Sequence, residues 1–280
     1  MRLQDHIEIG ETYEDISFRA AEIILAELRR KPDLLLCAAG GSTPARTYEL
    51  LVEAYHKNPG VFDSLRIVKL DEWGGIAMDD PRSCETQLQR QLIKPLGLTP
   101  ERYYSLESNA KVPELDCKKR RESLEMVGPI DLCVLGLGMN GHIGMNEPAP
   151  ALKPWTHVAR LAEVSLQHPM LDISDRLLLN ILPQPTDRLQ QDTTIIAHPS
   201  RALPTYGVTL GMTEILASRA VLLLVNGDKK RDAVERLMRH EITTDFPASF
   251  LWLHSNWTFL CAQDAARGLE LHPDKTCANP

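Results

Sequence analysis

Short apolar runs alternate along this chain with segments of helical periodicity, and this alternation restricts the folds that it can adopt. Residues 34–38 form a continuous apolar run that ends at Gly40 and Gly41, as a buried parallel strand does. Further strand-like runs occupy 65–70, 130–135, 206–210, 220–225, 250–253 and 258–262. Helices are expected over 14–30, 44–57, 83–93, 114–126 and 229–239. Strands alternating with helices predict an α/β protein with a mostly parallel, doubly wound sheet.

The chain length of 280 residues suits one large domain that needs no disulfide or metal ion to stabilise it. We expect a single domain over 1–266 and a polar C-terminal tail over 267–280. Residues 172–205 carry prolines at 183, 185, 199 and 204 around a short apolar patch, so we interpret them as an insertion that crosses the main sheet.

Charge and hydropathy argue against nucleic-acid and membrane partners. The 31 Lys+Arg residues are outnumbered by 38 Asp+Glu residues, a net charge of −7, whereas nucleic-acid binding needs clustered positive charge. The tight basic run at 118–121 precedes glutamates and is more typical of a solvated helix face. No apolar stretch approaches the ~18 residues of a membrane span, and the N-terminus lacks the apolar core of a signal peptide. We expect a cytoplasmic protein.

The six cysteines are scattered and form no C-x-x-C pair. Cys37, Cys133 and Cys261 lie inside apolar runs, where cysteine behaves as a small core residue. Neither a disulfide framework nor a metal site is therefore expected.

The unusual residues of the chain collect after the predicted strands, where ligands bind in open α/β sheets. The first such loop, Gly-Gly-Ser-Thr-Pro at 40–44, offers backbone N–H groups and two hydroxyls. Thr43 is expected to cap the following helix, with Pro44 at its first position. This loop suits a phosphate, with Lys230 as countercharge; the alternative is a plain turn and a surface lysine.

Two carboxylates, Asp71 and Glu72, directly follow the second apolar run, so one of them should point into the ligand crevice. A carboxylate in that position could act as a general base on a C–H acid. The alternative is a helix cap or a structural ion pair.

The loop at 136–148 contains the dinucleotide-binding spacing Gly136-x-Gly138-x-x-Gly141. That fingerprint needs a helix directly after it, whereas prolines follow here, which argues against a dinucleotide. What remains is a glycine-flanked His142 with Glu147 five residues further on, a pair suited to acid/base chemistry. The alternative is a structural histidine.

Taken together, these loops resemble the glucosamine-6-phosphate deaminase (isomerase) family. The resemblance runs from about residue 12 to 262, and its most specific part is Asn-Gly-His-Ile-Gly-Met-Asn-Glu-Pro at 140–148. The other matching segments are Gly-Gly-Ser-Thr-Pro at 40–44, Leu-Asp-Glu-Trp at 70–73 and Gly-Asp-Lys-Lys at 227–230. Within the family, the Leu-Asp-Glu-Trp form, Asn140 and the segment at 247–256 are most similar to galactosamine-6-phosphate deaminases.

The resemblance implies a Rossmann-like three-layer α/β/α sandwich and an amino-sugar-phosphate deaminase/isomerase. Such an enzyme converts an aldose 2-amino-6-phosphate into the ketose 6-phosphate and ammonia, without a metal or organic cofactor. From galactosamine 6-phosphate the ketose is tagatose 6-phosphate. The implied partner is therefore a small sugar phosphate, and a homo-oligomer is compatible with the sequence.

The resemblance also assigns roles to individual residues. Asp71 matches the base that moves a proton between C2 and C1, and His142 matches the histidine that opens the pyranose ring. Glu147 matches the carboxylate that supports this histidine, with Asn140 beside it. The phosphate site corresponds to Gly41, Ser42, Thr43 and Lys230.

The chain departs from the family pattern at two points. Family members that act on glucosamine 6-phosphate usually have an aspartate where this chain has Asn140. An amide can orient an imidazole but cannot compensate the charge of an imidazolium, which leaves Glu147 as the carboxylate beside His142. The phosphate-binding arginine of the family has no clear counterpart, and the candidates are Arg176, Arg201 and, more weakly, Arg160. No allosteric regulation is inferred.

Three alternative functions stay open at this stage. Glucosamine-6-phosphate deaminase is the first, since the two substrates differ only at C4. A 6-phosphogluconolactonase would share the fold and the Gly-His loop, but the ending Asn146-Glu147-Pro148 argues against it. A sugar-phosphate sensor would need a DNA-binding helix-turn-helix, which the ~12 residues before the first helix cannot form.

Overall fold

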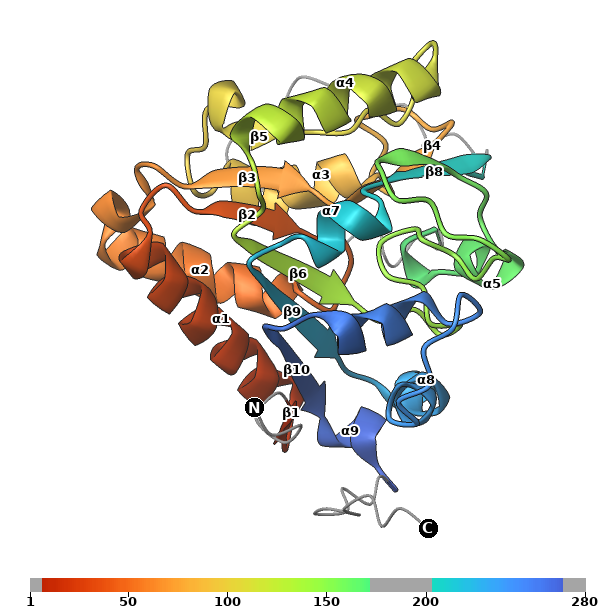
Figure 1. Ribbon diagram of the computed structural model, residues 1–280. Helices are drawn as coiled ribbons and strands as arrows, with labels where there is room; N and C mark the ends of the chain where they lie inside the picture. Colours follow the sequence, from red (N-terminus) through yellow and green to blue (C-terminus); the bar gives the residue numbers. More distant parts are fainter. Residues whose placement is uncertain (1–6, 172–202, 269–280) are drawn as a thin grey trace, which may run out of the picture.

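A seven-stranded parallel sheet forms the centre of the molecule (Figure 1). The computed structural model describes residues 7–171 and 203–268. Across the sheet the strand order is β1 (Ile7–Gly10), β10 (Trp257–Ala262), β9 (Ala220–Val225), β6 (Leu132–Gly136), β2 (Leu35–Ala38), β3 (Arg66–Lys69) and β5 (Tyr103–Tyr104). All neighbouring pairs are parallel. The chain winds outward in both directions from β2 and β6, so the switch point between these two strands is where a ligand site is expected.

Helices cover both faces of this sheet and complete three layers. One face packs against α1 (Tyr13–Arg30), α2 (Ala45–Lys57), α3 (Cys84–Leu88) and the π-helical turn η3 (Gln89–Ile93). The other face packs against α4 (Pro113–Val127), α7 (Met212–Leu216), α8 (Arg231–Leu237) and the 3₁₀ segment η7 (Pro247–Leu253). In Figure 1, α1 and α2 lie on the opposite side of the sheet from α4. The predicted three-layer α/β/α sandwich is confirmed.

Alternation along the strands explains why the sequence shows continuous apolar runs. Leu34, Leu36 and Ala38 face the layer that contains α1 and α2, whereas Leu35 and Cys37 face the opposite layer. Because helices cover both faces, every position of such a strand is buried. Cys37, Cys133 and Cys261 are fully buried, as expected.

A second, smaller sheet corrects two expectations about strands. β4 (Asp71–Gly74), β8 (Tyr206–Thr209) and β7 (His157–Ala159) pair antiparallel in the order β4-β8-β7. The strand expected at 206–210 therefore belongs to this sheet and not to the parallel one. The loop expected at 71–73 is itself a strand. It pairs with β8, more than 130 positions away in the chain, and local patterning cannot reveal such a pairing.

Two further local expectations were wrong. The run at 250–253 lies in η7, where Pro247 at the first turn lacks the N–H of a strand and has its φ preset for a helical turn. Thr43 does not cap α2: the cap position is Pro44, and no side chain of the segment bonds there. Instead the hydroxyl of Tyr13 in α1 accepts the N–H of Arg46 at 3.1 Å.

The remaining short elements connect these layers. They are η2 (Pro59–Phe62), η4 (Pro100–Arg102), α5 (Glu163–Leu166), η5 (Pro169–Leu171), η6 (Asp228–Lys230) and α9 (Gln263–Ala266). Most of the expected insertion at 172–205 and of the tail at 267–280 lies outside the described residues.

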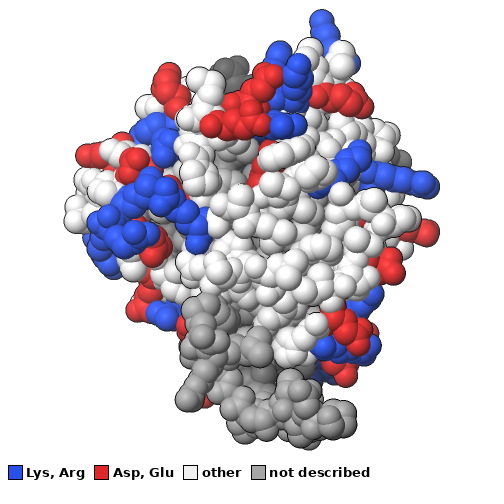
Figure 2. Space-filling model, viewed as in Figure 1, with Lys and Arg blue, Asp and Glu red and all other residues white. Residues whose placement is uncertain are grey.

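The basic run at 118–121 lies on α4 and is partly a solvated face. Lys118 and Lys119 are exposed, whereas Arg120 and Arg121 lie over the rings of Tyr104 and Trp155. In the view of Figure 2, positive and negative side chains are interspersed, and the centre of this face is largely uncharged. Within the described ranges no helix is long and apolar enough to cross a membrane.

Candidate active site

A cavity of about 560 Å³ opens at the carboxyl ends of the central strands. Its wall brings together the four loops that the sequence singled out, which come from chain segments up to 190 positions apart. Every predicted site residue except Asn140 lines it: Gly41, Ser42, Thr43, Asp71, His142, Glu147 and Lys230. Asn140 lies behind this wall and contacts two of its residues.

The loop after β6 carries His142 and is shaped by two glycines. A side chain at Gly138 would overlap the imidazole ring of His142, so the ring packs directly on the backbone. Gly141 has a φ of +88°, and a side chain there would overlap the ring of Phe246. These glycines therefore position the imidazole. No helix lies within 137–156, whereas the dinucleotide fingerprint needs a helix directly after its last glycine.

The neighbours of His142 fix the position of its ring proton. Nδ1 lies 2.8 Å from Oδ1 of Asn140, whose Nδ2 donates to Glu147 Oε2 at 2.8 Å. An ionised carboxylate accepts only, so the amide must present its NH₂ to Glu147 and its oxygen to the ring. Nδ1 of His142 therefore carries the proton, and Nε2 is free to accept one. Nε2 has no partner among the residues that the structure describes.

Glu147 is the charged end of this chain of hydrogen bonds. Its Oε2 lies 3.4 Å from Nδ1 of His142, and its Oε1 accepts from the hydroxyl of Ser165 in α5 at 2.5 Å. Burial favours the neutral carboxyl, but the bonds from His142, Ser165 and Asn140 outweigh burial and lower the pKa of Glu147 to about 2. Glu147 is thus a permanent negative charge that can stabilise a protonated His142.

Asp71, the first residue of β4, presents the second carboxylate of the cavity. Its Oδ1 lies 3.8 Å from Sγ of Cys84. Burial, and next the negative charge of Glu72, raise its pKa to about 6, although His142 and Lys69 pull in the opposite direction. A carboxylate with a pKa near neutrality can both take up and return a proton, which is what a proton shuttle needs.

Glu72 takes the structural role that was the alternative for this acidic pair. It is fully buried and accepts hydrogen bonds from Lys69 Nζ at 2.7 Å and from the N–H groups of Cys84 and Glu85 at the start of α3. Lys69 Nζ also donates to Glu85 at 2.7 Å. Each interpretation of the acidic pair therefore applies to one residue: Asp71 faces the cavity, and Glu72 has the structural role of anchoring β4 to α3.

The cavity is also lined by groups that could donate to an anion. Among the described residues, the hydroxyls of Ser42 and Thr43 have no hydrogen-bond partner, and Lys230 forms no ion pair. Burial lowers the pKa of Lys230, as expected of a cation that awaits a counterion. The N–H of Gly41, by contrast, already donates to Oε1 of Gln87 at 3.1 Å.

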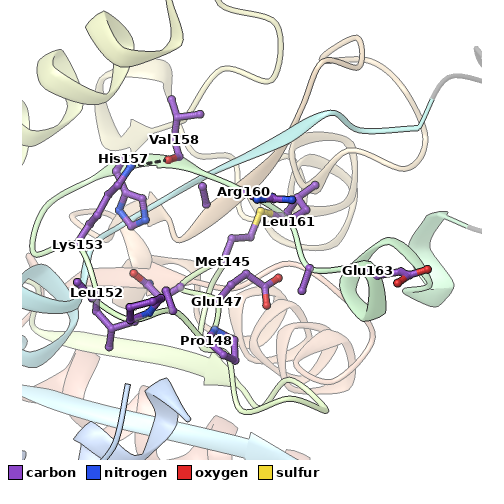
Figure 3. A pocket seen from close by; sticks show the side chains of 16 residues that line it. Met145, Glu147, Pro148, Leu152, Lys153, His157, Val158, Arg160, Leu161 and Glu163 are labelled. Atoms are coloured by element: carbon purple, nitrogen blue, oxygen red, sulfur yellow. Dashed lines mark hydrogen bonds between the residues drawn. The ribbon is translucent and has the colours of Figure 1, made fainter. Parts of the chain in front are cut away.

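Arg160, the arginine candidate that lies within the described residues, does not line this cavity. Arg160 is exposed and borders a second cavity of about 550 Å³, which Glu147 also lines (Figure 3). Arg176 and Arg201 lie outside the described residues. Over 7–171 and 203–268 there is also no group of three or more His, Cys, Asp or Glu side chains placed to hold a metal ion.

Sequence reasoning missed four residues that the fold brings to the site. Ser165 and His168 come from a segment without helical or strand periodicity, and only its position soon after the 140–148 loop could have drawn attention to it. Cys84 and Gln87 lie on a helix that the sequence did predict, but nothing in its pattern shows that its first turn reaches the cavity.

The fold and the cavity define an α/β protein in which Asp71, His142 and Glu147 line the same cavity as the hydroxyls of Ser42 and Thr43 and the ammonium group of Lys230. A family model described as glucosamine-6-phosphate isomerases/6-phosphogluconolactonase matches residues 11–145. A protein of Escherichia coli (strain K12) that carries the name deaminase AgaI is 39% identical over 251 residues, which cover 90% of this chain and 88% of that protein. Glucosamine-6-phosphate deaminase 1 of Bacillus subtilis (strain 168) is 33% identical over 256 residues, 91% of this chain and 96% of that protein.

Solved structures agree with these relatives. A monomeric glucosamine-6-phosphate deaminase superimposes with a TM-score of 0.79 at 32% identity and covers 93% of this chain and 98% of its own. A 6-phosphogluconolactonase from Leishmania guyanensis superimposes with a TM-score of 0.69 at 20% identity over 94% and 98%, a likeness of fold alone. The chain belongs to the glucosamine-6-phosphate isomerase/6-phosphogluconolactonase family, and the expected resemblance and enzyme class are confirmed.

Proposed function

We propose that the chain deaminates a 2-amino-2-deoxyhexose 6-phosphate, with galactosamine 6-phosphate as the substrate and tagatose 6-phosphate and ammonia as the products. The observation that carries the proposal is that Asp71 and His142 line the same cavity as Ser42, Thr43 and Lys230, which could hold a phosphate. In this proposal a sugar phosphate held there by its phosphate presents its first carbons to Asp71 and His142.

Ring opening is the task of His142 in this proposal. Nε2 accepts the proton of the C1 hydroxyl and returns one to the ring oxygen, so the C1–O5 bond breaks and the aldehyde forms. The imidazolium that exists in between is stabilised by Glu147, directly at 3.4 Å and through Asn140.

Isomerisation is the task of Asp71. The carbonyl at C1 acidifies the C2–H bond, and Asp71 takes this proton. The carbonyl oxygen takes up a proton from solvent, so that an enolamine with a hydroxyl at C1 forms between C1 and C2. Return of the proton to C1 leaves an iminium at C2, which water hydrolyses to the ketose with release of ammonia. Glucosamine and galactosamine 6-phosphates would follow the same course, because they differ only at C4.

Sequence similarity supports the galacto substrate. The Leu-Asp-Glu-Trp form at 70–73, Asn140 and the segment at 247–256 are most similar to galactosamine-6-phosphate deaminases. The relative named AgaI, whose name specifies no glucosamine substrate, is also more similar than the Bacillus subtilis deaminase, at 39% against 33% identity.

A parallel assay of both epimers tests the proposal. Ammonia and ketose 6-phosphate release should be at least about tenfold more efficient, in kcat/KM, with galactosamine 6-phosphate than with glucosamine 6-phosphate. Preference for the gluco epimer would reject the substrate but keep the reaction. Inactivity on both, with hydrolysis of 6-phosphogluconolactone, would overturn the proposal in favour of a lactonase.

A further inference from the structure

His168 is a cavity residue that neither the acid/base pair nor the predicted phosphate loop accounts for. It lies between α5 and η5, is partly buried, and lines the cavity with His142 and Lys230. Its Nδ1 accepts the N–H of Met170 at 3.2 Å, and its ring is tilted against that of Trp73 with 6.1 Å between centroids. Nδ1 is therefore unprotonated, so Nε2 carries the ring proton as a hydrogen-bond donor.

Two observations place His168 near the glycine loop at 40–44 and near Lys230. Its own segment packs on the glycine loop, because a side chain on Gly41 would begin 3.7 Å from Sδ of Met170. Burial lowers the pKa of His168 to about 4, and the positive charge of Lys230 contributes next, ahead of His142. At neutral pH the ring is therefore uncharged. Its Nε2–H has no acceptor among the described residues.

We propose that Nε2–H of His168 donates a hydrogen bond to the phosphate group of the substrate, beside Lys230 and the hydroxyls of Ser42 and Thr43. No arginine of the described ranges lines this cavity, so the donors that these ranges can offer to a phosphate are single hydrogen-bond donors of this kind and Lys230. A neutral imidazole adds a donor without burying another cation next to Lys230. The inference deepens the proposed function and rests on it for the nature of the substrate.

A purely structural role for His168 would depend on the other ring nitrogen. Nδ1 holds the turn by accepting from Met170, and this bond alone would explain an inward-facing histidine. Two amide substitutions separate the roles. His168→Asn retains an acceptor near the position of Nδ1 but removes the distant donor, whereas His168→Gln retains a donor near the position of Nε2.

The test measures KM, kcat and competitive inhibition by inorganic phosphate for both variants. His168→Asn should raise KM and the phosphate inhibition constant by about 10- to 100-fold, the loss expected for one hydrogen bond to a charged group, with kcat within about twofold. His168→Gln should stay within about threefold of the parent on both constants. A normal His168→Asn with an impaired His168→Gln would overturn the proposal, as would a phosphate inhibition constant that neither variant changes.

The matched control is His157→Asn, which alters a histidine of the second cavity that bonds the carbonyl of Trp155. It should leave KM, kcat and the phosphate inhibition constant unchanged.

Calorimetric titration with inorganic phosphate compares the parent and His168→Asn without turnover. If no amino sugar phosphate is a substrate, weaker phosphate binding by His168→Asn would still support the role of His168 while the proposed function fails. Equal phosphate binding by the parent and His168→Asn would overturn the role proposed for His168.

Discussion

Asn140 donates a hydrogen bond of 2.8 Å from its amide nitrogen to the carboxylate of Glu147. This contact orients the amide, so that its single oxygen faces Nδ1 of His142 and fixes the ring tautomer with Nε2 free. One neutral side chain thus connects the imidazole to the charge that stabilises its protonated form.

Glu147→Gln should lower kcat by about 100-fold or more, because an amide cannot stabilise the imidazolium that ring opening requires. Steady-state turnover of the cyclic amino sugar phosphate measures the effect. Glu163→Gln is the control: this glutamate is exposed, lies on the same stretch of chain and borders only the second cavity. Near-normal turnover by Glu147→Gln would rule out the assigned role.

Asp71→Asn should stabilise the folded protein in a pH-dependent manner. The pKa of Asp71 is raised from 3.8, the ordinary value, to about 6 in the folded protein. The stabilising contribution of its protonated form is therefore complete below pH 3.8 and is lost as the pH rises through 6. The variant should equal the parent near pH 4 and exceed it above pH 6, by on the order of 1–2 kcal/mol after allowance for solvent screening. Urea unfolding across this pH range measures the difference.

Glu147→Gln should show the opposite trend. The folded pKa of about 2 lies below the ordinary value of 4.5, so ionised Glu147 stabilises the fold above pH 4.5 and loses this effect as the pH falls toward 2. The variant should therefore be less stable than the parent at pH 7 and approach it in acid. If both variants shifted stability in the same direction at pH 7, the assigned ionisation states would be wrong.

Lys69→Met should cost about 3–5 kcal/mol of unfolding free energy, because it leaves the carboxylates of Glu72 and Glu85 buried without their cation. Denaturant unfolding measures the loss. Adding Glu72→Gln and Glu85→Gln should recover part of it, since the uncompensated charges are then removed. Lys119→Met, on the exposed face of α4, should change stability by less than about 0.5 kcal/mol. No recovery in the triple variant would contradict the ion-pair account.

Gly138→Ala should lower kcat by about 100-fold with little loss of fold, because its new methyl group would displace the imidazole of His142. Turnover and far-UV circular dichroism together measure the two effects. Gly60→Ala controls for the change of residue type, since a methyl group there meets only side chains at 3.9 Å, far from the cavity. An active Gly138→Ala would mean that the ring can tilt without loss.

The parallel sheet could be predicted because burial on both faces leaves a strong local signal. The apolar run at 220–225 coincides with β9, and the runs at 34–38 and 130–135 contain most of β2 and β6. The convergence of the loops on one cavity could be predicted as well, because the carboxyl ends of parallel strands lie at the same edge of the sheet. The small antiparallel sheet could not be predicted, because Asp71–Gly74 is short and starts with two carboxylates, and its partner is distant in the chain.

Only some residues of the candidate site could be predicted from the sequence. Asp71 follows an apolar run, His142 follows Gly141, and Glu147 lies five residues further on in the same loop; this local context made them recognisable. Ser165 and His168 lie in a segment without periodicity, and their importance depends on which side chains the tertiary fold brings within reach. The separate roles of Asp71 and Glu72 likewise became visible only once α3 was seen to rest on Glu72.

In the proposed reaction, Asp71 carries the proton of an amino sugar 6-phosphate between C2 and C1. The most direct measurement is ammonia release from galactosamine 6-phosphate by the parent and by Asp71→Asn, at pH 7.5, with folding of both checked by thermal unfolding. We expect turnover by the parent and a loss of at least about 1,000-fold in a variant that is folded and no less stable. Comparable ammonia release by Asp71→Asn would contradict it.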